Sequence, residues 1–268
     1  MDRTSQITQL KSRALVAVRG QDWAGFLQGL LTQDVETLGP GTLRFGALLT
    51  PQGRLLFDLF IVGAEDGCRL DCAADRLQAL IQRLMIYRLR AKVEIAPDPA
   101  AVFAAWGGAQ PAGDWRADPR LAELGWRGYG VRATATTDEA AYEAHRLSLG
   151  VPGPADWGED ATYPLEADFD LLGGVDFKKG CFVGQETTSR MKRRSAVRSR
   201  MLPLDFDGPA PAAGTEVLAG TLRAGEVLSG EGGRAMALLR LDRIEGKALT
   251  ADGRPCTPAP PKWWPSEV

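Results

Sequence analysis

Short hydrophobic stretches recur in the first hundred residues, and three of them, residues 14–19, 68–72 and 91–95, alternate between hydrophobic and polar positions with a period of two. This period is typical of β-strands that bury one face, and the turn sequence Thr50-Pro51-Gln52-Gly53 separates two of the stretches as in a hairpin. The stretches that we predict as strands are residues 14–19, 45–49, 55–62, 68–72 and 91–95.

Between these strands, apolar residues recur at spacings of three and four, which indicates amphipathic helices. The first helix is predicted to begin after Asp22 as its N-cap and to end near residue 31. Asp75 is expected to cap a second helix, and a third is predicted over residues 138–147. Strands and helices that alternate in this way predict an α+β domain.

The pattern changes twice in the rest of the chain. Residues 97–119 are rich in Pro, Gly, Ala and Asp, which predicts a variable loop or the edge of a subdomain, with Trp106 and Trp115 exposed to whatever packs there. After Met201, short apolar runs are separated by Gly and Pro, which predicts a small antiparallel barrel. The proline-rich tail from Pro255 is expected to lie extended over the body of the protein.

Composition narrows the class of protein. The chain has 268 residues, 44% of them hydrophobic, and a formal net charge of −2. This length predicts roughly two domains, and the charge excludes a strongly basic protein, so that nucleic-acid binding would need a local patch. No apolar stretch is long enough to cross a membrane and no signal sequence is recognised, so we expect a cytoplasmic protein.

The cysteines and the histidine limit the possible metal chemistry. Four cysteines do not make a dense disulfide framework, which favours a reducing compartment. Cys68 and Cys72 alternate with Leu70 on one predicted strand, so we interpret them as part of an apolar face and not as a metal site. Since His145 is the single histidine, a site made of several imidazoles is excluded.

The stretch with most chemistry is residues 178–186, with the sequence KKGCFVGQE. Two lysines precede Cys181, and their positive charge favours the thiolate form, while the glycines on either side allow tight turns. Gln185 and Glu186 add groups that can hydrogen-bond a ligand. These residues fit a nucleophile, a metal or cluster ligand or a redox group, and they equally fit a small buried cysteine.

A run of basic residues follows this stretch. Six of eleven positions are basic and none is acidic. Such a run usually forms a solvated face, but beside a cleft it would attract an anionic ligand or partner. The six residues are Arg190, Lys192, Arg193, Arg194, Arg198 and Arg200.

Residues 179–186 resemble the signature of the YgfZ family of folate-binding proteins, which are relatives of the glycine-cleavage T-protein, an aminomethyltransferase. The signature reads KGC, an aromatic residue, a small or branched residue and then GQE, and all of it is present. Other blocks resemble the family as well, so the resemblance covers nearly the whole chain. These blocks are residues 26–34, 49–54, 87–90, 146–152 and 163–167.

The resemblance implies the fold of the T-protein. In this GcvT-like α+β fold, interlocked ferredoxin-like subdomains surround a central cleft and a C-terminal β-barrel follows. We accordingly expect a folate-binding, aminomethyltransferase-like domain of two subdomains in residues 1–200, and a small β-barrel with its tail in residues 201–268. Tetrahydrofolate or a derivative is the implied cofactor of the cleft.

The resemblance also implies a function. Members of the YgfZ family assist the assembly or repair of iron-sulfur clusters, with A-type carrier proteins as partners. We therefore expect an accessory factor, monomeric when free and not a conventional enzyme, that depends on Cys181. Because clusters usually have about four protein ligands, Cys181 is expected to share a transient cluster with the carrier. Ligand contacts are expected from Lys179, Gly180, Gln185, Glu186, Arg190 and Glu166.

Two alternatives stay open. Asp58 lies where the T-protein has an acidic pair that acts on folate, which implies a folate-dependent one-carbon transferase with Asp58 in acid–base catalysis. Ser148 stands where the T-protein has a folate-contacting glutamate, so the transferase's ligand set is incomplete. The other alternative is a nucleic-acid-binding module that uses the basic run from Arg190.

Overall fold

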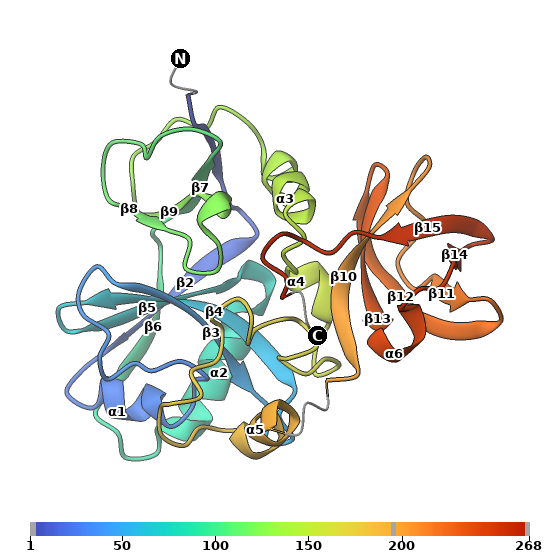
Figure 1. Ribbon diagram of the computed structural model, residues 1–268. Coiled ribbons are helices and arrows are strands. Elements are labelled where there is room, and N and C mark those ends of the chain that lie inside the picture. The colour runs from blue at the N-terminus through green and yellow to red at the C-terminus, as the bar shows by residue number, and fades with distance from the viewer. Residues whose placement is uncertain (1–3, 194–196, 266–268) are drawn as a thin grey trace.

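Two antiparallel sheets and a closed barrel make up the protein, whose computed structural model describes residues 4–193 and 197–265 (Figure 1). The first sheet has the strand order β3-β4-β5-β2-β6, and helices α1 and α2 pack on one face of it (Figure 1). Its elements are β2 (Arg13–Arg19), α1 (Trp23–Gln28), β3 (Leu43–Leu49), β4 (Leu55–Ala64), β5 (Gly67–Ala73), α2 (Leu77–Arg88) and β6 (Glu94–Asp98).

The second sheet is interlocked with the first. Strand β1 pairs with β7, although the whole first sheet lies between them in the sequence, and the order is β1-β7-β9-β8. Its strands are β1 (Gln6–Gln9), β7 (Val102–Trp106), β8 (Trp115–Ala117) and β9 (Trp126–Tyr129), and α3 (Glu139–Ser148) follows them. The chain therefore leaves the second sheet after one strand and returns only when the first sheet is complete.

The third part is the barrel, which closes in the order β10-β13-β12-β11-β14-β15 and lies beside the two sheets (Figure 1). The predicted antiparallel barrel is confirmed. Its elements are β10 (Ser199–Phe206), β11 (Glu216–Ala219), β12 (Leu222–Glu231), β13 (Arg234–Arg240), α6 (Leu241–Ile244), β14 (Leu249–Ala251) and β15 (Arg254–Pro258).

The expected extended tail is only partly confirmed. Residues 254–258 form strand β15 inside the barrel, so the tail begins later than Pro255. Beyond this strand the chain returns to the body, where the indole Nε1 of Trp263 donates to the carbonyl oxygen of Leu149 at 2.9 Å. The tail thereby ties the barrel to the end of α3.

The predicted hairpin, the strand of Cys68 and Cys72, and the third helix are confirmed. Both cysteines are buried in β5, as one apolar strand face requires. The carboxylate of Asp138 caps α3 by accepting from the backbone N–H of Ala141 at 3.0 Å. These elements follow from local patterns that need no distant partner.

Three predicted boundaries are wrong. Helix α1 ends at Gln28 and not near residue 31, because Leu31 instead bridges to Leu48 at the edge of the first sheet. Asp75 lies in a short 3-10 turn (Ala74–Arg76) ahead of α2, which begins at Leu77. Strand β6 begins at Glu94, three residues later than predicted.

The predicted loop over residues 97–119 is also wrong. Strands β7 and β8 fall within it, and Trp106 and Trp115 are only 4% and 5% exposed. All five residues of β7 are buried, because its two faces pack into different core clusters, one with the first sheet and α3 and the other around Trp115. A strand that is buried on both faces does not alternate, so its short apolar run gave no strand signal.

Buried ion pairs join the two sheets at the centre of the protein. The guanidinium of Arg13 on β2 donates to Asp58 on β4 at 2.7 Å and to Asp71 on β5 at 2.6 Å. From the second sheet, Arg127 on β9 donates to the other oxygen of Asp71 at 2.9 Å. Because burial without a partner would be costly for each of these charges, the pairs fix how the sheets pack.

Aromatic and acidic groups complete this network. The Arg127 guanidinium lies 3.5 Å from the ring centroid of Phe60, and Arg120 lies 4.8 Å from the same centroid. Asp118 accepts from Arg120 at 2.8 Å and from Arg127 at 3.1 Å. Burial alone would raise the pKa of Asp118, but the two guanidiniums lower it to about 2.

We expect Asp118→Asn to destabilise the protein by at least about 2 kcal/mol at pH 7. The folded-state pKa lies below the unfolded value, so this stabilisation is present above about pH 4 and is lost as the pH falls toward 2. Urea unfolding at pH 7 and between pH 2 and 4 measures both effects. Asp66→Asn is the matched control, because Asp66 is exposed and lies 3.9 Å from Arg19. Equal stabilities of the two variants would contradict the role of the network.

Candidate functional site

Cys181 lies on the loop that precedes α5 (Gln185–Arg193) and exposes its thiol to solvent. The other three cysteines, Cys68, Cys72 and Cys256, are buried. Burial raises the pKa of Cys72 to about 12 and also raises that of Cys68 and Cys256, so these three remain thiols at neutral pH. Cys181 is therefore the cysteine that can meet a ligand or partner.

Lys179 anchors this loop to the end of α1. Its ammonium group donates to the carbonyl oxygens of Gln28 at 2.7 Å and Leu31 at 2.6 Å. Gln28 is the last residue of α1, so its carbonyl has no donor within the helix, and Leu31 lies just after the helix. A cation supplies donors to both carbonyls. Burial lowers the pKa of Lys179 to about 8, so the ammonium form still predominates at pH 7. Lys179 thus points into the protein and has a structural role, because its ammonium group is hydrogen-bonded to these two carbonyls.

The loop is held on both sides of Cys181, by backbone hydrogen bonds before it and by the side chain of Phe182 after it. The carboxylate of Asp176 accepts from the backbone N–H groups of Lys178 at 2.8 Å and Lys179 at 3.2 Å. Phe182 is 7% exposed and packs into a core cluster of the body. The N–H of Val183 donates to Gly29 at 3.2 Å. Cys181 is thus an exposed position between two fixed ones.

Two glycines then lock the loop against the β3–β4 turn. Gly53 and Gly184 have φ angles of +87° and +81°. A Cβ atom on Gly184 would lie 2.6 Å from the carbonyl oxygen of Thr50 and 2.9 Å from Cα of Gly53. Only glycine fits both the backbone conformation and this close approach. Gly180 differs, since a Cβ there would meet nothing within 4 Å.

Side chains after α1 brace the segment that leads into the loop. The hydroxyl of Thr32 donates to the carbonyl of Gly174 at 2.6 Å and accepts from the N–H of Ala47 at 2.8 Å. The amide of Gln33 donates to Gly173 at 2.7 Å. Residues 28–33, the turn at 50–53 and the cysteine motif, far apart in the sequence, thus form one structural unit. Sequence reasoning missed these roles, although the blocks at 26–34 and 49–54 had been singled out.

The predicted ligand-binding residues are brought together only in part. Gly180, Gln185, Glu186 and Arg190 lie with Cys181 on the loop and α5, and the amide of Gln185 approaches the Gly180 carbonyl at 3.5 Å. Glu186 and Arg190 are exposed. The structure therefore gathers one part of the predicted set around the thiol.

Glu166 closes a separate turn. Its carboxylate accepts from the backbone N–H of Tyr163 at 3.0 Å, and burial raises its pKa. His145 is also engaged elsewhere, because its ring stacks on Trp106 and lies 2.9 Å from the carbonyl of Glu123. Among the described residues, neither side chain hydrogen-bonds to the cysteine loop.

The basic run does not form one solvated face. Arg200 is buried on β10, where it donates to Asp168 at 3.0 Å and Asp170 at 2.9 Å. Lys192 on α5 pairs with the same Asp170 at 3.0 Å. Asp170 therefore connects α5 to the barrel, and Arg194 lies outside the described residues. The run was misread because its acidic partners lie about thirty residues upstream.

Asp58 does not line a ligand-sized cavity. It is 6% exposed and paired with Arg13, and the hollows beside it have volumes of about 30 Å³ and 160 Å³. Ligand pockets usually begin at roughly 300 Å³, and the smaller hollow has room for one or two water molecules. The side chains around Asp58 therefore do not fit a pterin ring as they stand.

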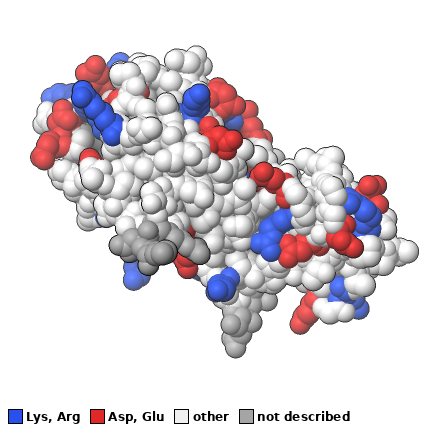
Figure 2. Space-filling model, turned by 90° about the horizontal axis from the view of Figure 1, so that it is seen from above, with Lys and Arg blue, Asp and Glu red and all other residues white. Residues whose placement is uncertain are grey.

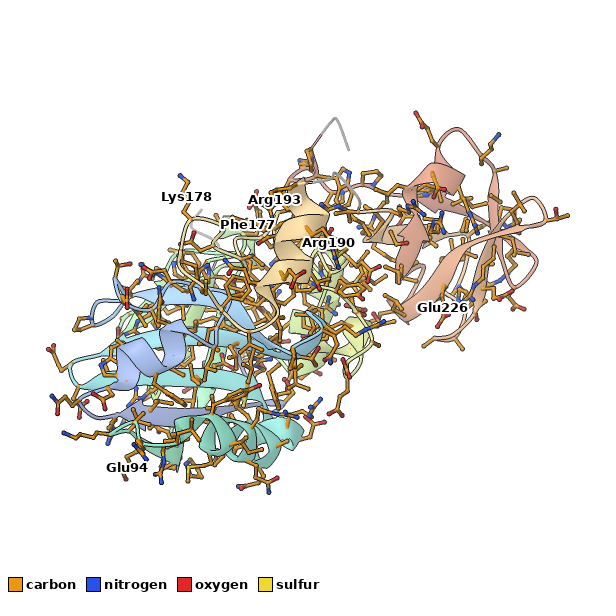
Figure 3. The ribbon with its side chains drawn as sticks, turned by 90° about the horizontal axis from the view of Figure 1, so that it is seen from below. Glu94, Phe177, Lys178, Arg190, Arg193 and Glu226 are labelled. Atoms are coloured by element: carbon orange, nitrogen blue, oxygen red, sulfur yellow. The ribbon has the colours of Figure 1, made fainter. Side chains whose placement is uncertain are left out.

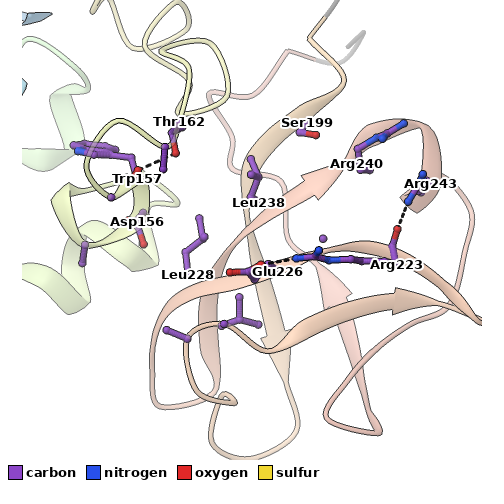
Figure 4. A pocket seen from close by; sticks show the side chains of 17 residues that line it. Asp156, Trp157, Thr162, Ser199, Arg223, Glu226, Leu228, Leu238, Arg240 and Arg243 are labelled. Carbon is purple, nitrogen blue, oxygen red and sulfur yellow. Dashed lines mark hydrogen bonds and ion pairs between the residues drawn. The ribbon is translucent and has the colours of Figure 1, made fainter. Parts of the chain in front are cut away.

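A hollow of about 600 Å³ lies between the barrel and the turn around α4 (Pro154–Trp157), as Figure 4 shows. Its apolar wall includes Trp157, Leu228 and Leu238. The arginine Arg223 at its rim is already paired with Glu226 at 2.5 Å. None of the predicted site residues lines this hollow, so it is separate from the candidate site.

The charge distribution does not support a broad nucleic-acid surface on the face that Figure 2 shows. There, basic and acidic side chains lie close to one another around a largely uncharged middle (Figure 2). Counterion release needs several basic groups along one track, which this face lacks. In the described part of the chain, no helix could cross a membrane, and no three His, Cys, Asp or Glu side chains are grouped to hold a metal ion.

Comparison with known proteins gives both sequence relatives and a structural neighbour. The chain is 31% identical to "Iron-sulfur cluster assembly factor IBA57, mitochondrial" of Mus musculus, over 96% of this chain and 85% of the mouse protein. It is 30% identical to the Homo sapiens protein of that name, with the same two coverages, 96% and 85%. The homolog of Pyricularia oryzae is 33% identical over 94% of this chain and 75% of its own length.

Residues 198–266 match the model of the CAF17 C-terminal beta-barrel domain. The whole chain is similar to the crystal structure of glycine cleavage system aminomethyltransferase T from Bartonella henselae, with a TM-score of 0.76 and 18% identity. The match covers 97% of this chain and 86% of that one. At this identity the likeness shows the fold alone, and the expected GcvT-like fold with a C-terminal barrel is confirmed.

We expect Gly184→Ala to destabilise the protein by at least about 2 kcal/mol, because the φ angle of +81° and the Thr50 carbonyl both disfavour a Cβ atom. Gly180→Ala, one residue before Cys181, has open space and should change stability by less than about 1 kcal/mol. Thermal unfolding and the rate of Cys181 alkylation measure both variants. An equal loss in the two would show that the contact with the 50–53 turn does not hold the loop.

Proposed function

This chain belongs to the IBA57 family of iron-sulfur cluster assembly factors, and we propose that it acts through the thiolate of Cys181. The supporting observation is an exposed thiol on a loop that is fixed at Lys179, Phe182 and Gly184. Thiolates are the usual ligands of cluster iron. A ligand held in one place by its surroundings binds with less loss of entropy than a mobile one.

The proposal assigns the other ligands to a partner. Clusters usually have about four protein ligands, and Cys181 supplies one of them. We therefore infer that the cluster is shared at an interface with an A-type carrier protein, as cargo that both chains hold. Cys181 gives up its proton to solvent and donates a sulfur lone pair to an iron atom that has an open position. Gly180 leaves room beside the thiol for the partner's backbone, since a Cβ at this position has no neighbour within 4 Å.

We also propose that the chain is related to the YgfZ family, on the basis of the sequence KGCFVGQE at residues 179–186. The names of the mouse and human relatives describe them as mitochondrial. For this chain, the cytoplasmic location expected from the sequence stays a prediction. The predicted monomeric state of the free protein is also a prediction.

Replacing Cys181 tests the proposal directly. Mixed anaerobically with a cluster-loaded A-type carrier, the wild-type protein should form a complex that keeps its iron-sulfur absorption through gel filtration. Cys181→Ser should lose at least about 90% of the retained cluster, because a serine oxygen is a poor ligand for this iron. Unfolding should be unchanged, since Cys181 is exposed.

Cys256→Ala is the matched control, because it removes a buried thiol from the barrel and should leave the retained cluster unchanged. Cluster retention by Cys181→Ser at the wild-type level would rule out Cys181 as the ligand. Absence of any complex with the wild type would remove the carrier as partner.

Tetrahydrofolate binding remains a prediction, with a defined structural requirement. The side chains around Asp58 do not fit a pterin, so binding there requires Arg13 to leave the carboxylate. The alternative function, a folate-dependent one-carbon transferase, would also require Arg13 to leave the Asp58 carboxylate. Anaerobic titration with tetrahydrofolate tests both. Saturable binding that is weakened by Asp58→Asn would support a cleft that opens between Arg13 and Asp58. Absence of saturable binding would rule out both folate binding and the one-carbon transferase.

A further inference from the structure

A hollow of about 560 Å³ lies beside the cysteine loop, between Phe177 and the outer face of α5. Its size falls in the range of sites that take an amino-acid side chain or a small ligand, and is far larger than an ion needs. The lining residues are Phe177, Gln185, Glu186, Ser189, Lys192 and Arg193, which we call the α5 socket.

Phe177 gives the α5 socket an exposed apolar wall. It is 38% exposed, so part of its ring is available for contact with a partner. The ammonium of Lys192 lies 5.7 Å from its ring centroid and is itself held by buried Asp170 at 3.0 Å. The ring and this cation are thus placed before any partner arrives, which lowers the entropic cost of binding.

Several cations lie in or near the α5 socket. Arg193 lines it, Arg190 projects from α5 outside the lining, and Lys178 lies beside Phe177 (Figure 3). The exposed acid among the lining residues is Glu186. Since basic groups outnumber Glu186 in and near this apolar wall, it is complementary to an apolar side chain flanked by carboxylates.

The socket and the thiol belong to one rigid loop. Phe177 and Cys181 are four residues apart, and the chain between them is fixed by Asp176 and by Lys179. A partner that seats a side chain against Phe177 is therefore held at a defined position relative to Cys181. Docking at the α5 socket would therefore place the partner's cluster near Cys181, which docking at a remote patch would not do.

We propose that the α5 socket is the docking surface for an acidic partner protein, which inserts one apolar side chain against Phe177 and places carboxylates against Lys178, Arg190 and Arg193. This inference rests on the proposed function, because it takes the partner to be the carrier that presents the cluster to Cys181. A nucleic acid is disfavoured, because one phenylalanine beside Glu186 offers no stacking track and places a carboxylate among the cations.

Binding of the cluster-free carrier, measured by calorimetry, tests docking separately from ligation. Phe177→Ala should weaken binding at least about tenfold, as expected for an aromatic anchor. Lys178→Glu combined with Arg193→Glu should weaken it at least about a hundredfold and reduce its dependence on salt. Cys181→Ser should bind the cluster-free carrier as the wild type does.

Two matched controls use similar residues away from the α5 socket. Leu222→Ala removes another exposed apolar side chain, 64% exposed on the barrel. Arg90→Glu with Lys92→Glu reverses two charges near Glu94, which lies at the opposite end of the body from α5 (Figure 3). Both controls should bind as the wild type does, and all variants are first checked for wild-type unfolding.

The outcomes separate this inference from the proposed function. Wild-type affinity of the Phe177 and charge-reversal variants would overturn the docking surface, even if Cys181 still retains the cluster. A complex that forms only with the cluster-loaded carrier would also overturn it, because ligation alone would then hold the partner. Weakened docking by these variants, with no effect of Cys181→Ser on cluster retention, would support the α5 socket and overturn the ligand role. Preferential, salt-sensitive binding of RNA at the α5 socket would overturn the protein partner.

Discussion

The contact between Lys179 and the end of α1 is the interaction on which the position of Cys181 depends. One ammonium group satisfies two carbonyl oxygens, that of Gln28 at the last residue of α1 and that of Leu31 just after the helix. The chain on either side of Lys179 is thereby fixed to the first sheet, and Gly184 completes the attachment at the 50–53 turn. The motif is therefore a rigid support for one thiol, and its lysine is structural.

The interior of the protein explains why a shared fold need not mean a shared chemistry. The fold is similar to that of an aminomethyltransferase T, yet the centre is filled by ion pairs that join the sheets. Asp58, the carboxylate expected to face a ligand, is paired with Arg13 and buried. The cysteine thiol that a partner can reach lies on the surface at Cys181 instead. The fold alone therefore does not show which chemistry the protein performs.

Local patterns predicted the elements that form through local interactions. The hairpin of β3 and β4, the cap of α3 and the barrel strands were correct for this reason. Strand β7 was missed because its burial on both faces depends on packing against elements distant in sequence. The partners of Lys179 lie 151 and 148 residues away, and no spacing in the sequence reveals them. Arg200 was misassigned for the same reason, and Phe177 was missed because exposure of an apolar residue is a property of the folded surface.

The most direct test of the central claim is X-ray absorption at the selenium edge, with selenocysteine in place of Cys181, on the anaerobic complex with a cluster-loaded carrier. The account predicts a selenium–iron scattering path at bonding distance, which is absent from the free protein. Selenium with only carbon neighbours, in a complex that retains its cluster, would show that the thiol at position 181 does not ligate iron.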